Sequence, residues 1–243
     1  MPEEARPAFY ALAPGGMRDY VTLLHPPYTA WHLSYVAIGA AVAGELEAGR
    51  LLPTLVAFFL AVGVAAHALD ELHGRPLRTE IPSRTLVALA AASLAGAVAI
   101  GLYGALTVSP WIALFVAAGA VAVVGYSSEA WGGRLHGDFQ FALAWGSFPV
   151  LTGAFATAER LEVPALLAAA FAFLLSLAQR RLSTQVRDVR RRVVRVEGRV
   201  ERRDGTSEPV TTATLIEAEE RALRLLAASV VALAIALVAL RTA

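Results

Sequence analysis

Residues 85–108 read TLVALAAASLAGAVAIGLYGALTV, a run of 24 residues without a charged side chain. A helix needs about 20 apolar residues to cross the ~30 Å hydrocarbon core of a bilayer, so this run predicts a membrane-spanning helix. Soluble domains are about half apolar and about a quarter charged. This chain is 57% hydrophobic and 17% charged, with a mean hydropathy of +0.57. The apolar excess predicts a chain embedded in lipid.

Six similar stretches lie on either side of this run. Lipid cannot satisfy open backbone groups, so each spanning segment must be a helix. We therefore predict an all-α fold, a polytopic transmembrane bundle of about seven spans that forms a single domain over residues 1–243. Ser109-Pro110 predicts a tight turn between two spans. The predicted spans are 28–44, 51–69, 85–108, 109–125, 139–157, 163–179 and 225–240.

The basic residues are distributed unevenly along the chain. All 21 are arginine, and 18 of them fall on one side of the predicted membrane. Positive charge collects on the cytoplasmic side of membrane proteins. We therefore expect a multi-pass protein of the plasma (inner) membrane, with a cytoplasmic N-terminus and an external C-terminus. The first 24 residues carry three prolines and no long apolar core, which is not the pattern of a cleavable signal peptide.

The segment 189–214 is rich in arginine, and its valines alternate loosely with charged residues. Asp204-Gly205 is a hairpin-turn dipeptide. Two interpretations stay open, a short polar β-hairpin or lid on the cytoplasmic side, and an unstructured loop that touches anionic headgroups. A helix is expected to begin near Thr212 and to continue into the last span.

Ionisable groups gather at the end of the second span, where residues 65–78 read AAHALDELHGRPLR. In a continuing helix His67, Asp70 and Glu71 share one face, because they are three and four residues apart. Carboxylates with an imidazole can hold a divalent cation. The alternative is a solvated helix end with ordinary charges. Gly74 is expected to end the helix, and Arg75 and Arg78 follow it.

The end of the sixth span repeats this arrangement in QRRLSTQVRDVRRR, residues 179–192. Gln185 and Asp188 share a helix face, with Arg181 and Arg187 near them. Cysteine is absent, which excludes thiolate chemistry. Two helix ends that offer oxygen ligands beside arginines predict a diphosphate–metal site, because guanidinium groups bind phosphate in bidentate fashion.

Weaker signals lie elsewhere in the chain. Tyr126 at a span end is more typical of an interfacial aromatic than of a catalytic group, and Asp138 is more typical of a helix N-cap than of a ligand. His32 within the first span either lines a cavity or forms a hydrogen bond between helices. Close helix packing is predicted at Gly39, Gly44, Gly63, Gly96, Gly101 and Gly146.

These segments, in this order, resemble the UbiA superfamily of intramembrane prenyltransferases over about residues 18–225. The family motif N-D-x-x-D-x-x-x-D, followed by R-P-L, falls on residues 66–74 and then 75–77, where Asp70 keeps its acid. The second motif, D-x-x-x-D with an Asn three residues earlier, is matched by Gln185 and Asp188. Arg192 replaces its final acid, and Gly74 stands where the first motif has its last one.

The resemblance implies a helical bundle around a cavity open to lipid, in which Mg²⁺ ionises a prenyl diphosphate and the prenyl group passes to a lipid-soluble acceptor. The partners expected are a prenyl diphosphate, membrane lipid and the bilayer, and no nucleic acid. We assign catalysis to Asp70, Asp188 and Tyr126. The metal is assigned to His67, Asp70, Glu71, Gln185 and Asp188, and the diphosphate to Arg75, Arg78, Arg134, Arg181, Arg187 and Arg192.

Positions 74 and 192 lack the acids of the family motifs, and this leaves an alternative to the transferase open. The chain would then be a UbiA-like membrane protein without transferase activity, and it would bind a lipid or a protein partner through 189–214. A transporter is a third interpretation, although no span carries the paired interruptions that mark transporter sites.

Overall fold

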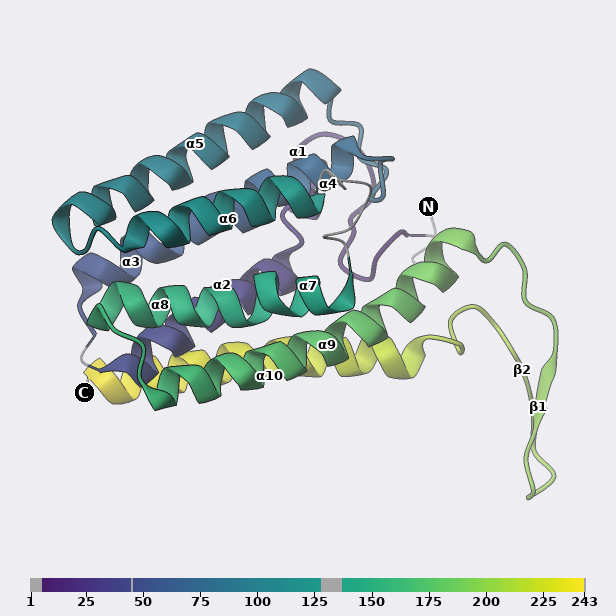
Figure 1. Cartoon of the computed structure of the whole chain (residues 1–243). Coiled ribbons are helices and arrows are strands. Elements are labelled where there is room, and N and C mark those ends of the chain that lie inside the picture. Colours follow the sequence, from purple (N-terminus) through teal and green to yellow (C-terminus); the bar gives the residue numbers. More distant parts are fainter. Residues whose placement is uncertain (1–5, 45, 128–136, 243) are drawn as a thin grey trace.

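Every predicted apolar stretch is helical in the computed structural model, which describes residues 6–44, 46–127 and 137–242. The helices pack side by side in a bundle (Figure 1). A short helix α1 (Met17–Leu23) precedes them. The longer ones are α2 (Pro26–Ala43), a continuous helix Ala48–Leu72, α5 (Ser83–Thr107), α6 (Ile112–Ser127), a continuous helix Asp138–Ala158, α9 (Val163–Arg192) and α10 (Glu217–Thr242).

Five of these helices are long and apolar enough to cross a membrane. They are Ala48–Leu72, Ser83–Thr107, Asp138–Ala158, Val163–Arg192 and Glu217–Thr242. The helix α6 is apolar but shorter, with 16 residues. The protein is thus a membrane protein with several helices able to span the bilayer, and the count of seven spans stays a prediction.

Two of the long helices contain π-helical segments. Ala48–Leu72 consists of α3 (Ala48–Phe58), the π-helical segment η2 (Phe59–Ala66) and α4 (His67–Leu72). Asp138–Ala158 consists of α7 (Asp138–Ala142), the π-helical segment η4 (Leu143–Ser147) and α8 (Phe148–Ala158). A π-helix displaces the backbone hydrogen-bond register by one residue, and such segments often occur at functional sites.

The ends of several helices test the sequence predictions. The turn at Ser109-Pro110 is present between α5 and α6, and α4 ends at Leu72 with Gly74 at a φ of 83°. The helix α9 continues to Arg192, well beyond the predicted end of the apolar span at 179, because Ser183, Val186 and Val189 extend its buried face. Val186 and Val189 pack against Ile216 and Leu223 beside α10.

Within 189–214 the chain leaves α9 and forms an antiparallel hairpin of β1 (Arg199–Glu201) and β2 (Ser207–Pro209). The hairpin projects beyond the bundle (Figure 1), and its strands are exposed. The helix α10 begins at Glu217 rather than near Thr212. Thr211 and Thr214 instead exchange hydrogen bonds, each backbone N–H donating to the other hydroxyl at 2.9 and 3.2 Å, and such local bonds compete with helix formation.

The helix α2 lies inside the bundle, where it packs mainly against α8 and α10. Its contact with α8 is backbone to backbone. A Cβ built on Gly39 would lie 2.0 Å from the carbonyl oxygen of Val150, and one on Gly153 would lie 2.1 Å from that of Val36. Gly39 is therefore a close packing position, as predicted, whereas Gly44 meets nothing within 4 Å and is not.

We expect Gly153→Ala to lower the free energy of unfolding by about 3 kcal/mol, because the added methyl group forces α2 and α8 apart. Thermal unfolding in detergent measures the change. Gly49→Ala is the matched control, since Gly49 lies in α3 with no atom within 4 Å of the added Cβ, and alanine favours a helix by up to about 1 kcal/mol. Equal stability of the two variants would contradict the packing argument.

Candidate functional site

A cavity of about 450 Å³ lies at the end of the bundle where α2 begins and α9 ends, within the size range of ligand pockets. Its walls come from α2, η2, α4, α6, η4, α9 and the N-terminal segment 7–10. That segment is held in place by α9, because Arg190 donates to the carbonyl oxygen of Arg6 at 3.2 Å and also pairs with Glu220 of α10. We call this space the polar cavity.

Five of the predicted site residues line the polar cavity. They are His67, Asp70, Tyr126, Arg187 and Arg192. The hydroxyl of Tyr126 accepts a hydrogen bond of 2.8 Å from Arg180, whose side chain also pairs with Asp138 at 3.2 Å. Asp138 thus holds Arg180 at the cavity wall. It is the first residue of α7 and Gly137 takes the N-cap position, so the prediction that Asp138 is the N-cap was wrong.

The other predicted residues within the described ranges do not line the cavity. Glu71 is fully buried, and its carboxylate accepts hydrogen bonds of 2.9 Å from the backbone N–H groups of Leu77 and Thr79 and from the Thr79 hydroxyl. Arg75 donates to the carbonyl oxygen of Ile81 in the same loop and to the hydroxyl of Ser83 at the start of α5. Exposed positions are taken by Arg78, Arg181, Gln185 and Asp188, and Arg134 lies outside the described residues.

The predicted metal ligands are therefore not brought together. His67 and Asp70 face the cavity, but Glu71 is occupied by the 77–79 loop, and Asp188 pairs with Arg192 at 3.3 Å on the surface. Among the described residues, no group of three or more His, Asp or Glu side chains is placed to hold a metal ion. These residues do not fit a Mg²⁺ site built by the protein alone, and the magnesium requirement stays a prediction.

Arginines dominate one side of the cavity. Arg187 and Arg191 lie one turn apart on α9, and neither has a carboxylate within ion-pair distance in the described part of the chain. The Nε of Arg191 is buried and has no hydrogen-bond partner among those residues. Asp70 is the one carboxylate among the described lining residues. This side therefore offers hydrogen-bond donors of the kind that pair with phosphate oxygens in charge-assisted hydrogen bonds.

Arg180 and Arg191 were not predicted as site residues, because the helix face beyond residue 179 was assigned to Gln185 and Asp188, which are exposed. The signal was present in the spacing of Ser176, Gln179 and Ser183, which are buried in α9. Extending that three- and four-residue spacing past 179 places arginines 180, 187 and 191 beside the same stripe. The cavity is also lined by Tyr10, His25 and Tyr28. The sequence carries no comparable signal for these three, because only the packing of the N-terminal segment against α2 brings them together.

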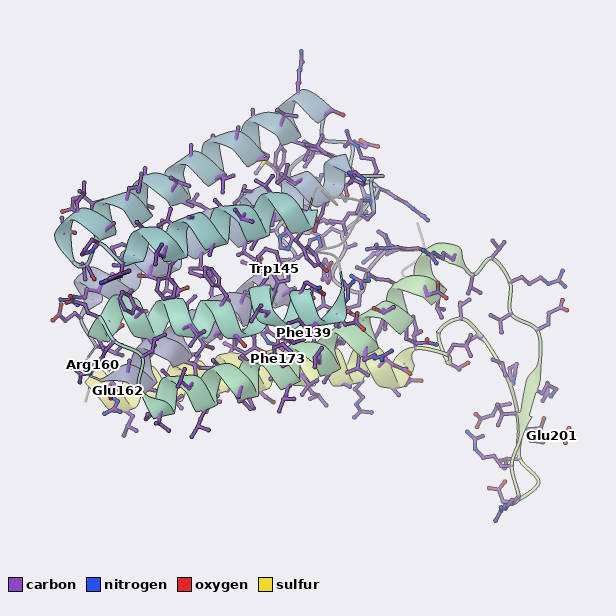
Figure 2. All side chains as sticks on the ribbon, viewed as in Figure 1. Phe139, Trp145, Arg160, Glu162, Phe173 and Glu201 are labelled. Atoms are coloured by element: carbon purple, nitrogen blue, oxygen red, sulfur yellow. The ribbon has the colours of Figure 1, made fainter. Side chains whose placement is uncertain are left out.

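A second cavity of about 150 Å³ adjoins the first. Apolar side chains of α3, η2, α5, α6 and α8 line most of it, including Phe58, Phe115 and Phe148. Val62 of η2 and Trp145 of η4 line both cavities. Figure 2 shows Trp145 within the bundle and Glu201 on the hairpin outside it. We call this second space the apolar cavity, and both π-helical segments lie at its boundary with the polar one.

Two histidines stack in the wall of the polar cavity. The rings of His25 and His67 are 4.0 Å apart at an angle of 13°, and Nδ1 of His25 is 3.0 Å from the hydroxyl of Tyr10. Burial holds the pKa of His25 well below its usual value, with a smaller contribution from His67. Burial likewise raises the pKa of Tyr10. Both groups are therefore neutral near pH 7.

The fold and its cavities define a helical membrane protein in which a polar cavity adjoins an apolar one. Comparisons with family models, with curated proteins and with solved structures find no match for this chain. The resemblance to the UbiA superfamily therefore stays a prediction from the sequence motifs.

We expect Glu71→Gln to lower the free energy of unfolding by about 2 kcal/mol, because the amide group cannot accept from all three donors of the 77–79 loop. Thermal unfolding in detergent measures this. Glu201→Gln on the exposed hairpin is the control, with no expected change. A destabilisation that appears only when Mg²⁺ is present would instead indicate a metal ligand.

We expect the stability of the protein to fall as the pH drops from 7.5 to 5.5. The folded pKa of His25 lies below its unfolded value of about 6.5, so the stability is full above that pH and is lost below it, by on the order of 1 kcal/mol for this residue. Thermal unfolding at the two pH values should show a smaller loss in His25→Asn. Asparagine suits the positive φ of 45° at this position.

The matched control is His73→Asn, because His73 is exposed. That variant should keep the pH dependence of the unchanged protein. Identical pH dependence of the stability in His25→Asn and in the unchanged protein would show that folding does not lower the pKa of His25.

Proposed function

We propose that this protein binds a prenyl diphosphate, with the diphosphate in the polar cavity and the prenyl chain toward the apolar cavity, and that it transfers the prenyl group to a lipid-soluble acceptor. The observation that carries the proposal is the pair Arg187 and Arg191, which face the polar cavity without a carboxylate partner among the described residues. Both arginines are partly buried, and a charge that is removed from water without a partner is costly, so an anionic ligand is the natural complement.

The headgroup of such a ligand needs hydrogen-bond donors, whereas its prenyl chain needs an apolar surface. Arg180, Arg187 and Arg191 supply N–H donors for a diphosphate, and they would stabilise the charge that develops on it when the prenyl carbon–oxygen bond breaks. The apolar cavity beyond Trp145 and Val62 supplies a surface that excludes water from the hydrocarbon chain. An amphiphile that carries a diphosphate satisfies both cavities.

The proposal includes the membrane arrangement that the arginine asymmetry predicts. We infer a UbiA-like bundle of about seven spans in the plasma membrane, with the polar cavity on the cytoplasmic side, where 18 of the 21 arginines lie. This arrangement would place the diphosphate at the cytoplasmic surface of the membrane and the prenyl chain within the hydrocarbon core of the bilayer.

Binding without transfer is the second candidate function. It is favoured by the shortage of acid, since Asp70 is the one carboxylate among the described residues that line the polar cavity. A prenyl transfer that depends on Mg²⁺ needs several such ligands, whereas retention of an anionic lipid needs none.

The test of the proposal is the affinity for a non-hydrolysable probe, farnesyl S-thiolodiphosphate, measured by calorimetry on the protein in lipid nanodiscs. We expect Arg187→Gln to weaken binding by ten- to a hundredfold, because each charge-assisted hydrogen bond contributes about 1.5–3 kcal/mol. Arg203→Gln, in the exposed turn of the hairpin, should bind as the unchanged protein does. Equal affinity of all three proteins would refute the assignment.

Release of diphosphate from farnesyl diphosphate then separates transfer from binding. Release that requires Mg²⁺ and vanishes in Asp70→Ala supports the transferase. Tight binding of the probe with no release under any metal condition supports the second candidate.

A further inference from the structure

The hairpin that follows α9 offers the edge of a β-strand to another chain. Every residue of β1 and β2 is exposed, and Figure 2 shows Glu201 of β1 outside the bundle. A hairpin of two strands has two outer edges, and the unpaired N–H and C=O groups of an edge are a template for a further strand. The question is which edge is available, and to what partner.

The hydrogen bonds of the hairpin show which residues face outward. The backbone N–H of Arg202 donates to the carbonyl oxygen of Thr206 at 2.8 Å, and that of Val210 donates to Gly198 at 3.0 Å. Alternate residues of an antiparallel strand direct their backbone groups toward opposite edges. The even-numbered residues of β1 therefore face β2, and its odd-numbered residues direct their N–H and C=O groups to the outer edge.

The outer edge of β2 is closed to pairing. Pro209 lies opposite Arg199 in the register, so its backbone nitrogen also faces outward. Proline has no N–H to donate, and proline on an edge strand is a common protection against pairing with another chain. The strand β1 contains no proline, so the outer edge of β1 is the one that remains available.

This open edge carries two charges without an ion-pair partner. On the face of the even-numbered residues, Arg202 pairs with Glu208 at 2.9 Å. On the other face, Nε of Arg199 donates to the hydroxyl of Ser207 at 2.9 Å. Neither Arg199 nor Glu201 forms an ion pair with another residue of the described ranges. Each copy of the chain thus presents a cation and an anion two positions apart along one edge.

We propose that β1 pairs with β1 of a second copy of this chain, antiparallel and centred on Val200. In this register Arg199 lies opposite the partner's Glu201, and Glu201 lies opposite the partner's Arg199. The backbone groups of all four residues face the partner, so each pair can exchange two hydrogen bonds. The two Val200 side chains, each 47% exposed, meet at the centre. 

The charges also exclude the neighbouring registers. A shift of two residues in one direction places the two copies of Arg199 opposite each other, and a shift in the other direction does the same for Glu201. Like charges directly opposite destabilise a strand pair, whereas opposite charges stabilise it. The sequence Arg199-Val200-Glu201 is therefore self-complementary in one antiparallel register.

The direction of the hairpin suits a dimer in one membrane. Two copies inserted with the same orientation are related by a rotation about the membrane normal, and an antiparallel strand pair has a two-fold axis perpendicular to its strands. Helices that span a bilayer lie within about 20° of the normal on average. The strands run across the direction of the helices (Figure 1), so a two-fold axis along the normal can relate them.

The interface is small, because each strand has three residues and a stable protein interface buries about 1,600 Å². We therefore expect a reversible dimer whose population rises with the amount of protein in the membrane. The inference goes beyond the proposed function, since it involves neither cavity, and its test contains no ligand.

Disulfide cross-linking in liposomes tests the pairing. The chain has no cysteine, so a single introduced cysteine reports only contacts between copies. The Cα atoms of opposing residues at the centre would be about 4.5 Å apart, within the reach of a disulfide, so with copper phenanthroline we expect Val200→Cys to cross-link about tenfold faster than Val194→Cys.

Val194→Cys is the matched control, because Val194 is 98% exposed and lies outside β1. Random collisions would cross-link this more exposed position the faster. Cross-linking of Val200→Cys that is equal to or slower than that of Val194→Cys would overturn the proposal, and a hairpin bound to lipid headgroups instead of to a second copy would give this result.

Charge reversal then tests the register. With Val200→Cys present, Arg199→Glu or Glu201→Arg places like charges across the pair, so we expect each variant alone to cross-link about fivefold more slowly. The two variants mixed in the same liposomes carry complementary charges. Cross-linking between them, identified by a size tag on one, should return to the original rate, which would also show that both fold. Failure of the mixture to recover would refute this register.

Discussion

Backbone contact between α2 and α8 joins a helix that lines the polar cavity to one that lines the apolar cavity. Glycine at positions 39 and 153 lets each helix approach the carbonyl oxygens of the other. This approach brings α2 close enough to η4 for His32 to reach the carbonyl oxygen of Trp145. A π-helical register can leave a backbone carbonyl without its partner in the helix, and here the side chain of His32 pairs with the carbonyl oxygen of Trp145. Packing, helix register and the hydrogen-bonding state of His32 are therefore linked.

The polar cavity separates its donors from its acceptors. Arginines of α9 form one side, and histidines of α2 and α4 form the other, with Asp70 also in the wall. The arginines that indicate membrane topology in the sequence thus also determine the chemistry of this end of the bundle.

The sequence predicted the helices well because a long uncharged run has few alternatives in lipid. It predicted less about which face is buried near a helix end. Beyond residue 179 the charged residues of α9 hide a buried stripe that only the packing of Val186 and Val189 makes clear. The π-helical segments have the same composition as their surroundings, so nothing local marks them. Glu71 was assigned to a metal because a shared helix face does not reveal that a following loop can take up a carboxylate.

The length of α9 has a further consequence. A helix of 30 residues is about 45 Å long at 1.5 Å per residue, whereas the hydrocarbon core is about 30 Å thick. About a third of α9 is therefore expected to extend past the lipid tails, and that third carries Arg187, Arg191 and Arg192 of the polar cavity. Ions of the aqueous phase reach this depth, so the attraction of the arginines for an anionic headgroup is screened over a Debye length of about 8 Å at physiological ionic strength. Occupancy of the polar cavity would then vary with the salt concentration of its surroundings, while the apolar cavity deeper in the bundle would not be affected.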